Sequence, residues 1–192
     1  MQPNLTRLFG TVAILGLVLL VAACGSSHKS SALLQIRNDA NNFVINPGFE
    51  RNPRFWIPYG AATPSRSTSV HHGGSASMQV GATGKTLGPY GVALPAAVGY
   101  PLKNEHFALS VWVEGPPHRS ILVEIAEQGG PFPTRVTTQR AFHLNGKWQR
   151  VSLVGGVQRK DRTALNIYLI RRSNIGLGES FYLDDVVLVP RR

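Results

Sequence analysis

Cysteine is almost absent from this chain. Cys24 is the only cysteine among 192 residues. A single cysteine cannot close an intrachain disulfide, and it cannot supply the cysteine pairs of a structural zinc site. The stability of the folded part must therefore come from its apolar core. The composition also permits a bound metal ion as a second contribution.

Acidic residues are scarce as well. Twenty Lys and Arg against 10 Asp and Glu give a formal net charge of +10, although only 16% of the residues are charged. Nucleic-acid-binding proteins usually gather basic residues on one helix or stripe. Here the basic residues are scattered, apart from the pairs Arg159-Lys160, Arg171-Arg172 and Arg191-Arg192. The pattern favours a cationic surface that faces anionic lipid or wall polymers, and it disfavours nucleic acid as a partner.

Catalytic motifs are a third absence. The chain has no G-x-S-x-G elbow, no Gly-rich phosphate loop and no H-E-x-x-H. The neighbouring His71 and His72 would diverge in a strand, and no third ligand is spaced to complete a metal site with them. Glu114 and Glu124 form a carboxylate pair of the kind that hydrolyses glycosides only if they lie on one face. We therefore expect no enzyme, with a glycoside hydrolase as the weaker alternative.

The N-terminus carries the parts of an export signal. Arg7 precedes an apolar run from Leu8 to Val21, and small residues follow up to Cys24. The run is shorter than the roughly 20 residues that a membrane-spanning helix needs. Small residues before Cys24, and Gly25-Ser26-Ser27 after it, resemble the lipobox of bacterial lipoproteins.

The lipobox resemblance implies a location. Residues 1–23 would be removed as a signal peptide, and a lipid on Cys24 would anchor the protein on the extracytoplasmic side of the cell membrane. Residues 24–41 contain four Ser, two Asn and one Lys and are predicted to form a flexible tether. A plain signal peptide or an uncleaved anchor is the alternative.

Beyond residue 41 the sequence has a β pattern and no amphipathic helical stretch of useful length. Apolar residues alternate with period two over residues 107–113, 121–126, 165–170 and 181–189. Turn-forming residues such as Gly115-Pro116-Pro117 and Asn145-Gly146 separate these runs. With no internal repeat, the pattern predicts one all-β domain over residues 42–192, a jelly-roll β-sandwich of two antiparallel sheets.

Five motifs follow one another along this domain. They are Asn46-Pro47-Gly48-Phe49-Glu50 with Phe55-Trp56 after it, His72-Gly73-Gly74-Ser75, the strand that holds Trp112, Gly146-Lys147-Trp148, and Phe181-Tyr182-Leu183-Asp184-Asp185. Their order and spacing resemble the CenC-like carbohydrate-binding modules (families 4, 9 and 22), which are jelly-roll sandwiches. The resemblance implies non-catalytic binding of a polysaccharide on one sheet face. A protein-binding or structural envelope lipoprotein on the same fold is the main alternative.

The family resemblance also implies structural calcium, which many members hold between their first and last strands. Carried over by position, Glu50 and Asp184 would be carboxylate ligands, with backbone carbonyls from Gly74 and Ser75. The alternative is that the two carboxylates only accept hydrogen bonds. Strand alternation itself places Asp184 on one face of the last strand and four apolar residues on the other: Phe181, Leu183, Val187 and Val189.

Alternation also selects candidate ligand-binding side chains. In residues 107–113 the apolar set points inward, which leaves Trp112 and then Glu114 outside. The same argument places Glu124, Asn166 and Tyr168 outside in the two later runs. Sugar rings stack their C–H faces on aromatics, and their hydroxyls pair with amides and carboxylates. We therefore expect one sugar platform from neighbouring strands, with Trp56 lining it or capping the core. The predicted ligand residues are Trp112, Tyr168, Glu114, Glu124, Asn166 and Trp56.

The predicted face departs from a dedicated glycan groove. Leu122, Ala126 and Ile170 also point outward by the same alternation, so the face is less polar than sugar binding usually requires. Loss of sugar binding, or binding of a protein instead, is therefore an open alternative.

Overall fold

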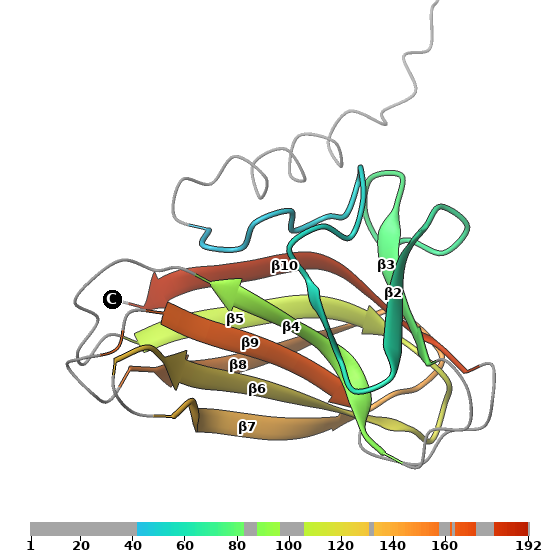
Figure 1. Cartoon of the computed structure of the whole chain (residues 1–192). Helices are drawn as coiled ribbons and strands as arrows, with labels where there is room; N and C mark the ends of the chain where they lie inside the picture. The colour runs from blue at the N-terminus through green and yellow to red at the C-terminus, as the bar shows by residue number, and fades with distance from the viewer. Residues whose placement is uncertain are drawn as a thin grey trace, which may run out of the picture.

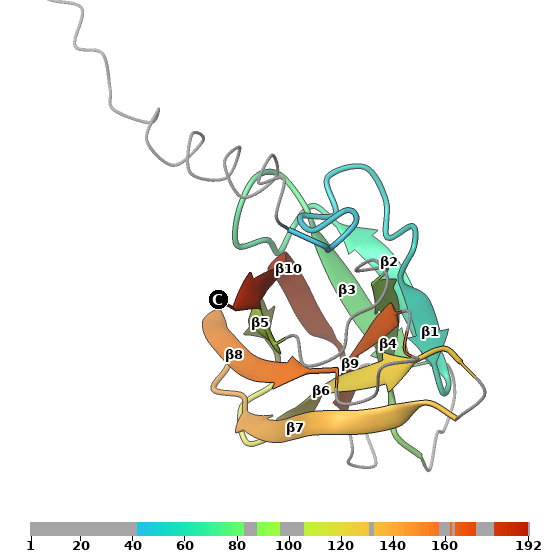
Figure 2. The same ribbon diagram turned by 90° about the vertical axis from the view of Figure 1, so that its left-hand side faces the viewer.

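The protein is a sandwich of two β-sheets. The computed structural model describes residues 42–82, 88–96, 106–130, 133–157, 162, 164–171 and 179–191. Its ten strands form two antiparallel sheets of five strands each, which pack face to face (Figures 1 and 2). The described residues contain no helix. The all-β prediction is confirmed, and the two-sheet arrangement is that of a jelly-roll sandwich.

Residues 1–41 lie outside the described part, and with them the predicted signal peptide, Cys24 and the tether. Among the residues that are described, no helix is long and apolar enough to cross a membrane.

The two sheets draw their strands from all along the chain. Sheet A has the order β1-β4-β9-β6-β7, and sheet B has the order β2-β3-β10-β5-β8. Sheet A consists of β1 (Ile57–Tyr59), β4 (Tyr90–Ala96), β9 (Ala164–Arg171), β6 (Ser120–Gln128) and β7 (Arg135–His143). Sheet B consists of β2 (Ala62–Ser67), β3 (Ser77–Ala82), β10 (Phe181–Arg191), β5 (His106–Glu114) and β8 (Gln149–Gly156).

The core forms where alternating apolar side chains of both sheets meet. In β5 the residues predicted to point inward are all buried, each 0 or 1% exposed: Phe107, Leu109, Val111 and Val113. The inward sets of β6 and β9 are buried to the same degree: Ile121, Val123, Ile125, Leu165, Ile167 and Leu169. Each such side chain contributes about 1.5–3 kcal/mol to folding. The inward predictions for these three strands are therefore confirmed.

The last strand departs from simple alternation. Phe181 and Leu183 are buried as predicted, but Val187 and Val189 are not the next core residues. A β-bulge lies between Asp184 and Val187, where Asp185 has a φ of 47°. The extra residue shifts the inward set to Val186 and Leu188, both 0% exposed. The predicted face of Val187 and Val189 is therefore wrong, because a bulge adds one residue to the alternation.

The segment before β1 extends sheet B along β10. Phe43 N–H donates to the carbonyl of Leu188 (2.9 Å), and Val186 N–H donates to the carbonyl of Pro47 (3.0 Å). The Asn42 side chain bridges the same stretch, since its Nδ2 donates to Val186 O (3.1 Å) and its Oδ1 accepts from Leu188 N (2.9 Å). The turn that follows delivers Phe49 to the core at 0% exposure, as the Asn-Pro-Gly motif predicted.

Two buried arginines fix the ends of β9. Before the strand, Arg162 donates to the carbonyls of Gly129 (2.6 Å) and Pro133 (2.9 Å), and its Nε lies 3.6 Å from the buried carboxylate of Glu127. At its end, Arg171 donates to Glu179 Oε2 (2.6 Å). Removing one partner of a buried ion pair costs about 3–5 kcal/mol. The strand that carries Asn166 and Tyr168 is therefore held firmly at both ends.

Candidate functional site

The outer face of sheet A brings together three of the predicted ligand residues. Glu124 on β6 lies directly opposite Tyr168 on β9, and Asn166 lies two positions from Tyr168 on the same outer face. The row continues through Ala93 on β4 to Ile57 on the edge strand β1. Because β6 and β9 are neighbours in one sheet, these side chains share one face as predicted.

Tyr59, which the sequence did not single out, completes the group. Its ring contacts Tyr168 edge to face, with centroids 6.1 Å apart and planes at 79°. Tyr59 is 39% exposed and Ile57 is 52% exposed. Between β1 and β9 lie Gly91 and Ala93, and a Cβ on Gly91 would collide with the carbonyl oxygen of Leu169. With no side chain larger than Ala93 between them on β4, the two tyrosine rings meet across this strand.

Asn166 acts on this face through Tyr168. Its side chain is only 6% exposed, and its Nδ2 donates to the Tyr168 hydroxyl at 3.1 Å. This bond fixes the direction of the phenol, since a buried amide has few rotamers free to it. We refer to Ile57, Tyr59, Glu124, Asn166 and Tyr168 as the tyrosine face.

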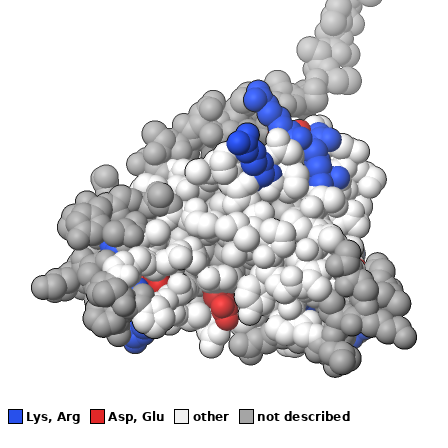
Figure 3. Space-filling model, in the orientation of Figure 1, with Lys and Arg blue, Asp and Glu red and all other residues white. Residues whose placement is uncertain are grey.

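The tyrosine face lies in a largely uncharged surface. Figure 3 views the molecule from the side of sheet A, where most atoms belong to uncharged residues, acidic atoms surface over β6, and Lys and Arg gather at one end. Aromatic rings beside one carboxylate can stack against apolar faces of a ligand and accept its hydroxyl hydrogens. The chemistry available here is recognition of a neutral polyhydroxylated molecule.

Trp112 and Glu114 lie on the opposite side of the sandwich. Both are on β5 in sheet B, so they cannot join Tyr168 in one platform. The prediction of a single platform is wrong in this respect, because alternation distinguishes inward from outward positions but does not assign a strand to a sheet. Glu114 lies opposite Tyr182, and burial raises the pKa of its carboxyl above the usual range.

Trp112 is covered by the loop between β2 and β3. The imidazole of His72 stacks on its indole with centroids 3.8 Å apart and planes at 16°, and Trp148 contacts the same imidazole at 5.7 Å. His72 is held in place by Asp185, whose Oδ2 lies 2.8 Å from Nδ1. The packed alternative for Trp112, under a loop, is the arrangement that the structure shows.

Trp56 belongs to the core. It is 4% exposed and its indole packs on Phe49, with ring centroids 5.5 Å apart. Its predicted role as a groove-lining residue is therefore wrong, and the alternative of a core cap is confirmed. The apolar packing around Phe49 explains why the Trp56 indole points into the core.

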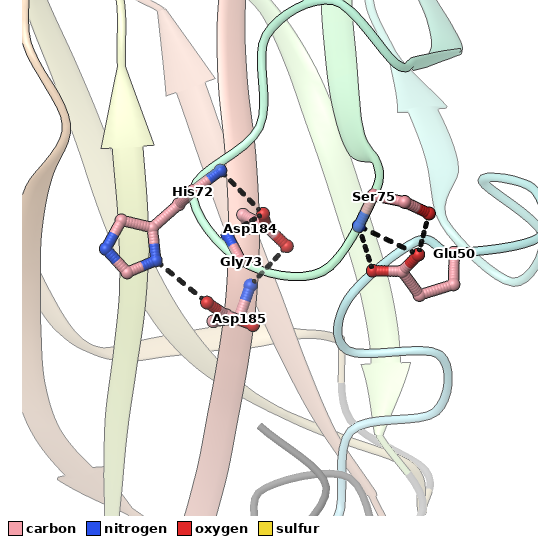
Figure 4. Close-up of polar contacts among 6 residues, drawn as sticks. All are labelled: Glu50, His72, Gly73, Ser75, Asp184 and Asp185. Atoms are coloured by element: carbon pink, nitrogen blue, oxygen red, sulfur yellow. Dashed lines mark hydrogen bonds and ion pairs between the residues drawn. The ribbon is translucent and has the colours of Figure 1, made fainter. Parts of the chain in front are cut away.

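Asp184 is a buried carboxylate surrounded by backbone N–H groups (Figure 4). Its Oδ2 accepts from the amides of His72 (2.9 Å) and Gly73 (3.0 Å), and its Oδ1 accepts from the amide of Asp185 (2.8 Å). Burial raises the pKa of Asp184 to about 7, against the lowering effect of these amides, and the neighbouring Asp185 charge adds to the rise. Asp184 thus ties the loop over Trp112 to the bulge of β10.

Glu50 is bonded separately, on the other side of this loop (Figure 4). Its carboxylate accepts from Ser75 N–H (3.2 Å) and from Ser75 Oγ (2.6 Å). Calcium needs six to eight oxygen ligands around one point, whereas here N–H and O–H donors face the carboxylates. The described residues also contain no cluster of three His, Cys, Asp or Glu side chains that could hold a metal. This arrangement of Glu50, Asp184, Gly74 and Ser75 does not fit a calcium ion.

Glu114 and Glu124, the two carboxylates on which the glycoside hydrolase alternative depends, do not lie on one face. Glu114 lies on the outer face of sheet B, and Glu124 lies on the outer face of sheet A. A two-carboxylate glycosidase needs both groups beside one scissile bond. These two side chains, separated by the sandwich core, do not meet that requirement.

Comparison with known proteins by sequence finds no relative. No protein-family model matches the chain, and no curated protein matches it.

Solved structures share the fold at low identity. A CBM22-1 xylan-binding domain from Paenibacillus barcinonensis Xyn10C is 18% identical, with 78% of this chain and 91% of that chain covered and a TM-score of 0.56. A family 16 carbohydrate-binding module is 17% identical, with 77% and 99% covered and a TM-score of 0.56. A cyclase from Fischerella sp. TAU is 15% identical, with 77% and 95% covered and a TM-score of 0.61.

Other similar structures are larger than this chain. In an arabinose-bound GH51 α-L-arabinofuranosidase the match covers 25% of that protein's chain. At these identities the likeness establishes the fold, which carbohydrate-binding modules share with domains of other function.

Proposed function

We propose that the protein is a non-catalytic polysaccharide-binding protein and that the tyrosine face is its binding site. One observation carries the proposal. The exposed Tyr59 and the partly buried Tyr168 form an aromatic pair beside Glu124, on a sheet face that is otherwise largely uncharged. The geometry offers ring faces for stacking and a carboxylate for hydroxyl groups within one row of strands.

The shape of the face suits an extended polymer. The row from Ile57 to Gln139 crosses all five strands of sheet A. At about 4.8 Å between strands it spans roughly 19 Å. The xylan-binding and other carbohydrate-binding modules among the similar structures support a polysaccharide as the ligand class.

A glycan-binding experiment tests this function. A fragment of residues 25–192 is applied to a panel of soluble and insoluble polysaccharides, together with Tyr168→Ala and Tyr59→Ala variants. We expect binding to at least one polymer, weakened at least tenfold by either substitution, as is usual for a central aromatic contact. The matched control is Tyr182→Ala, which removes a partly buried tyrosine from the outer face of sheet B.

Two outcomes would contradict the proposal. Equal losses for Tyr168→Ala and Tyr182→Ala would remove the tyrosine face as the binding site. Binding to none of the polymers would favour the alternative of a protein partner, for which the exposed Ile57 is the apolar anchor.

We further propose that the protein acts as a lipoprotein, with its lipid on Cys24, and holds polysaccharide at the cell membrane. The support is the apolar run and the residues around Cys24. Expression of the full chain with labelled fatty acid should label the protein and place it in the membrane fraction. Cys24→Ser should abolish the label, and a labelled variant would contradict the proposal.

A further inference from the structure

One end of the sandwich, beside β1 and β2, combines exposed apolar and cationic side chains. Ile45 is 51% exposed and Phe55 is 50% exposed. Arg51, Arg54 and Arg66 are also exposed. Figure 3 shows Lys and Arg gathered at this end. We refer to these five residues as the arginine end.

The loop that carries Phe55 is fixed by side-chain hydrogen bonds. Asn46 Nδ2 donates to the carbonyls of Asn52 (2.5 Å) and Arg54 (3.4 Å), and Arg54 N–H donates to Asn52 Oδ1 (2.9 Å). Phe55 adopts a φ of 77°, which is unfavourable for a bulky side chain. Phe55 is half exposed, and the Arg54 guanidinium lies 5.2 Å from the centre of its ring. Strain maintained by side-chain hydrogen bonds at an exposed aromatic indicates a role in binding.

The arginine end carries a net positive charge. Arg66 Nε donates to the backbone carbonyl of Glu50 (3.0 Å). Because Arg51 is the next residue after Glu50, this bond brings Arg66 close to the backbone of Arg51. The Glu50 carboxylate itself is hydrogen-bonded to Ser75. Three arginine charges are therefore balanced by only this one carboxylate charge. A cationic surface with an apolar tip fits an anionic partner that also offers an apolar layer.

The start of the described chain connects this end to the proposed anchor. Asn42 is bonded to β10 only three residues before Ile45. The 18 residue steps from Cys24 to Asn42 reach at most about 60 Å when fully extended. If Cys24 carries a lipid, as proposed above, the arginine end lies close to where the tether enters the domain and within reach of the bilayer.

From these observations we propose that the arginine end docks on the anionic lipid headgroups of the membrane. Arg51, Arg54 and Arg66 lie against the phosphates, and Phe55 and Ile45 enter the interfacial layer, where aromatic side chains are favoured. The arginine end adjoins the β1 edge of sheet A, whereas Tyr168 on β9 and Glu124 on β6 lie two and three strands away from that edge, so docking leaves these two strands open.

Vesicle co-sedimentation tests the docking surface without the lipid anchor. The fragment of residues 25–192 is suitable, because every core residue of the described part lies between Phe43 and Leu188. We expect it to bind vesicles that contain phosphatidylglycerol and not vesicles of phosphatidylcholine alone. Each arginine near the surface contributes about fivefold to binding, so Arg51→Gln with Arg54→Gln should weaken it at least tenfold. Phe55→Ala should weaken it as well.

The loop bonds of Arg54 use its backbone atoms, so these substitutions leave the loop intact. The charge-matched control is Arg135→Gln with Arg140→Gln on β7, both exposed and at the other edge of sheet A, which should leave binding unchanged. Tyr168→Ala should also leave it unchanged, so a failure of the polysaccharide proposal is distinguishable from a failure here. Equal losses for the two arginine pairs, no binding to anionic vesicles, or binding only to a soluble anionic wall polymer would overturn the proposal.

Discussion

The two outer faces of the sandwich carry similar residues and use them differently. On sheet B, Trp112 is stacked beneath His72 at 3.8 Å and the neighbouring Asp184 is completely buried. On sheet A, Tyr168 meets Tyr59 edge to face and no described loop is stacked on the pair. The first aromatic group fastens a loop to a strand, whereas the second joins two strands of one sheet. Trp112 and Tyr168 are both partly buried, so the two faces differ in what contacts the outward ring, which is a loop histidine on sheet B and a second tyrosine on sheet A.

This contrast predicts different costs for removing each aromatic, and we expect the largest effect on sheet B. Trp112→Ala removes the stack with His72 and uncovers the Asp184 region, which should lower the free energy of unfolding by about 3 kcal/mol. Tyr168→Ala removes a partly exposed ring and should cost about 1 kcal/mol. Urea unfolding measures both, and equal losses would contradict the distinction between the faces.

The next effect is a dependence of stability on pH, and it comes from Asp184 on sheet B. The folded-state pKa of Asp184, about 7, lies above its reference value of 3.8. The folded protein therefore binds a proton that the unfolded chain releases, so this contribution to stability is complete at low pH and is lost as the pH rises through 7. We expect the free energy of unfolding to fall by about 1–2 kcal/mol between about pH 5.5 and 7.

Asp184→Asn is the control for the pH effect, because the amide does not titrate. The variant should be less stable overall, since an amide cannot accept from all three backbone N–H groups that Asp184 holds. Its stability should nevertheless lose the pH slope over this range. An unchanged slope in thermal melts would assign the titration to another group.

A smaller effect is expected on polysaccharide affinity, and it should differ between Glu124 and Glu114. Glu124→Gln on the tyrosine face should weaken polysaccharide binding about tenfold, because a charged acceptor for hydroxyl groups is replaced by a neutral one. Glu114→Gln on sheet B should leave affinity unchanged. Isothermal titration with the polymer identified in the glycan panel measures both variants, and the reverse order would move the site to sheet B.

The smallest expected effect is that of chelation. Because hydrogen-bond donors already face the oxygens of Asp184 and Glu50, we expect the same melting midpoint with and without a calcium chelator. A midpoint that falls on chelation and returns with added calcium would restore the calcium site implied by the family resemblance.

Much of the fold could be predicted from the sequence because alternation is a local signal. The inward positions of β5, β6 and β9 were correct, and so was the burial of Phe49 after the Asn-Pro-Gly turn. The error in β10 begins at the bulge after Asp184, where Asp184 and Asp185 bond His72 of the loop above the strand. The alternation of apolar residues along β10 gives no sign of such an insertion.

The site was predicted only in part, for two physical reasons. Assignment of a strand to a sheet depends on pairing between distant segments, so Trp112 could not be separated from Tyr168 by alternation. Tyr59 lies in a strand of three residues, which is too short to show a period. Glu124, Asn166 and Tyr168 share one sheet face as predicted, because their strands are long and are neighbours. Asn166 is nevertheless buried and contacts Tyr168, which alternation alone does not reveal.

Polysaccharide binding on sheet A can be located residue by residue with a backbone NMR titration. As the polymer is added to the fragment of residues 25–192, amide shifts should move on β1, β4, β6 and β9, around Tyr59, Glu124 and Tyr168. Amides of β5, β8 and β10 around Trp112 should stay in place. Shifts centred on Trp112 and His72, with β6 and β9 unaffected, would contradict the account.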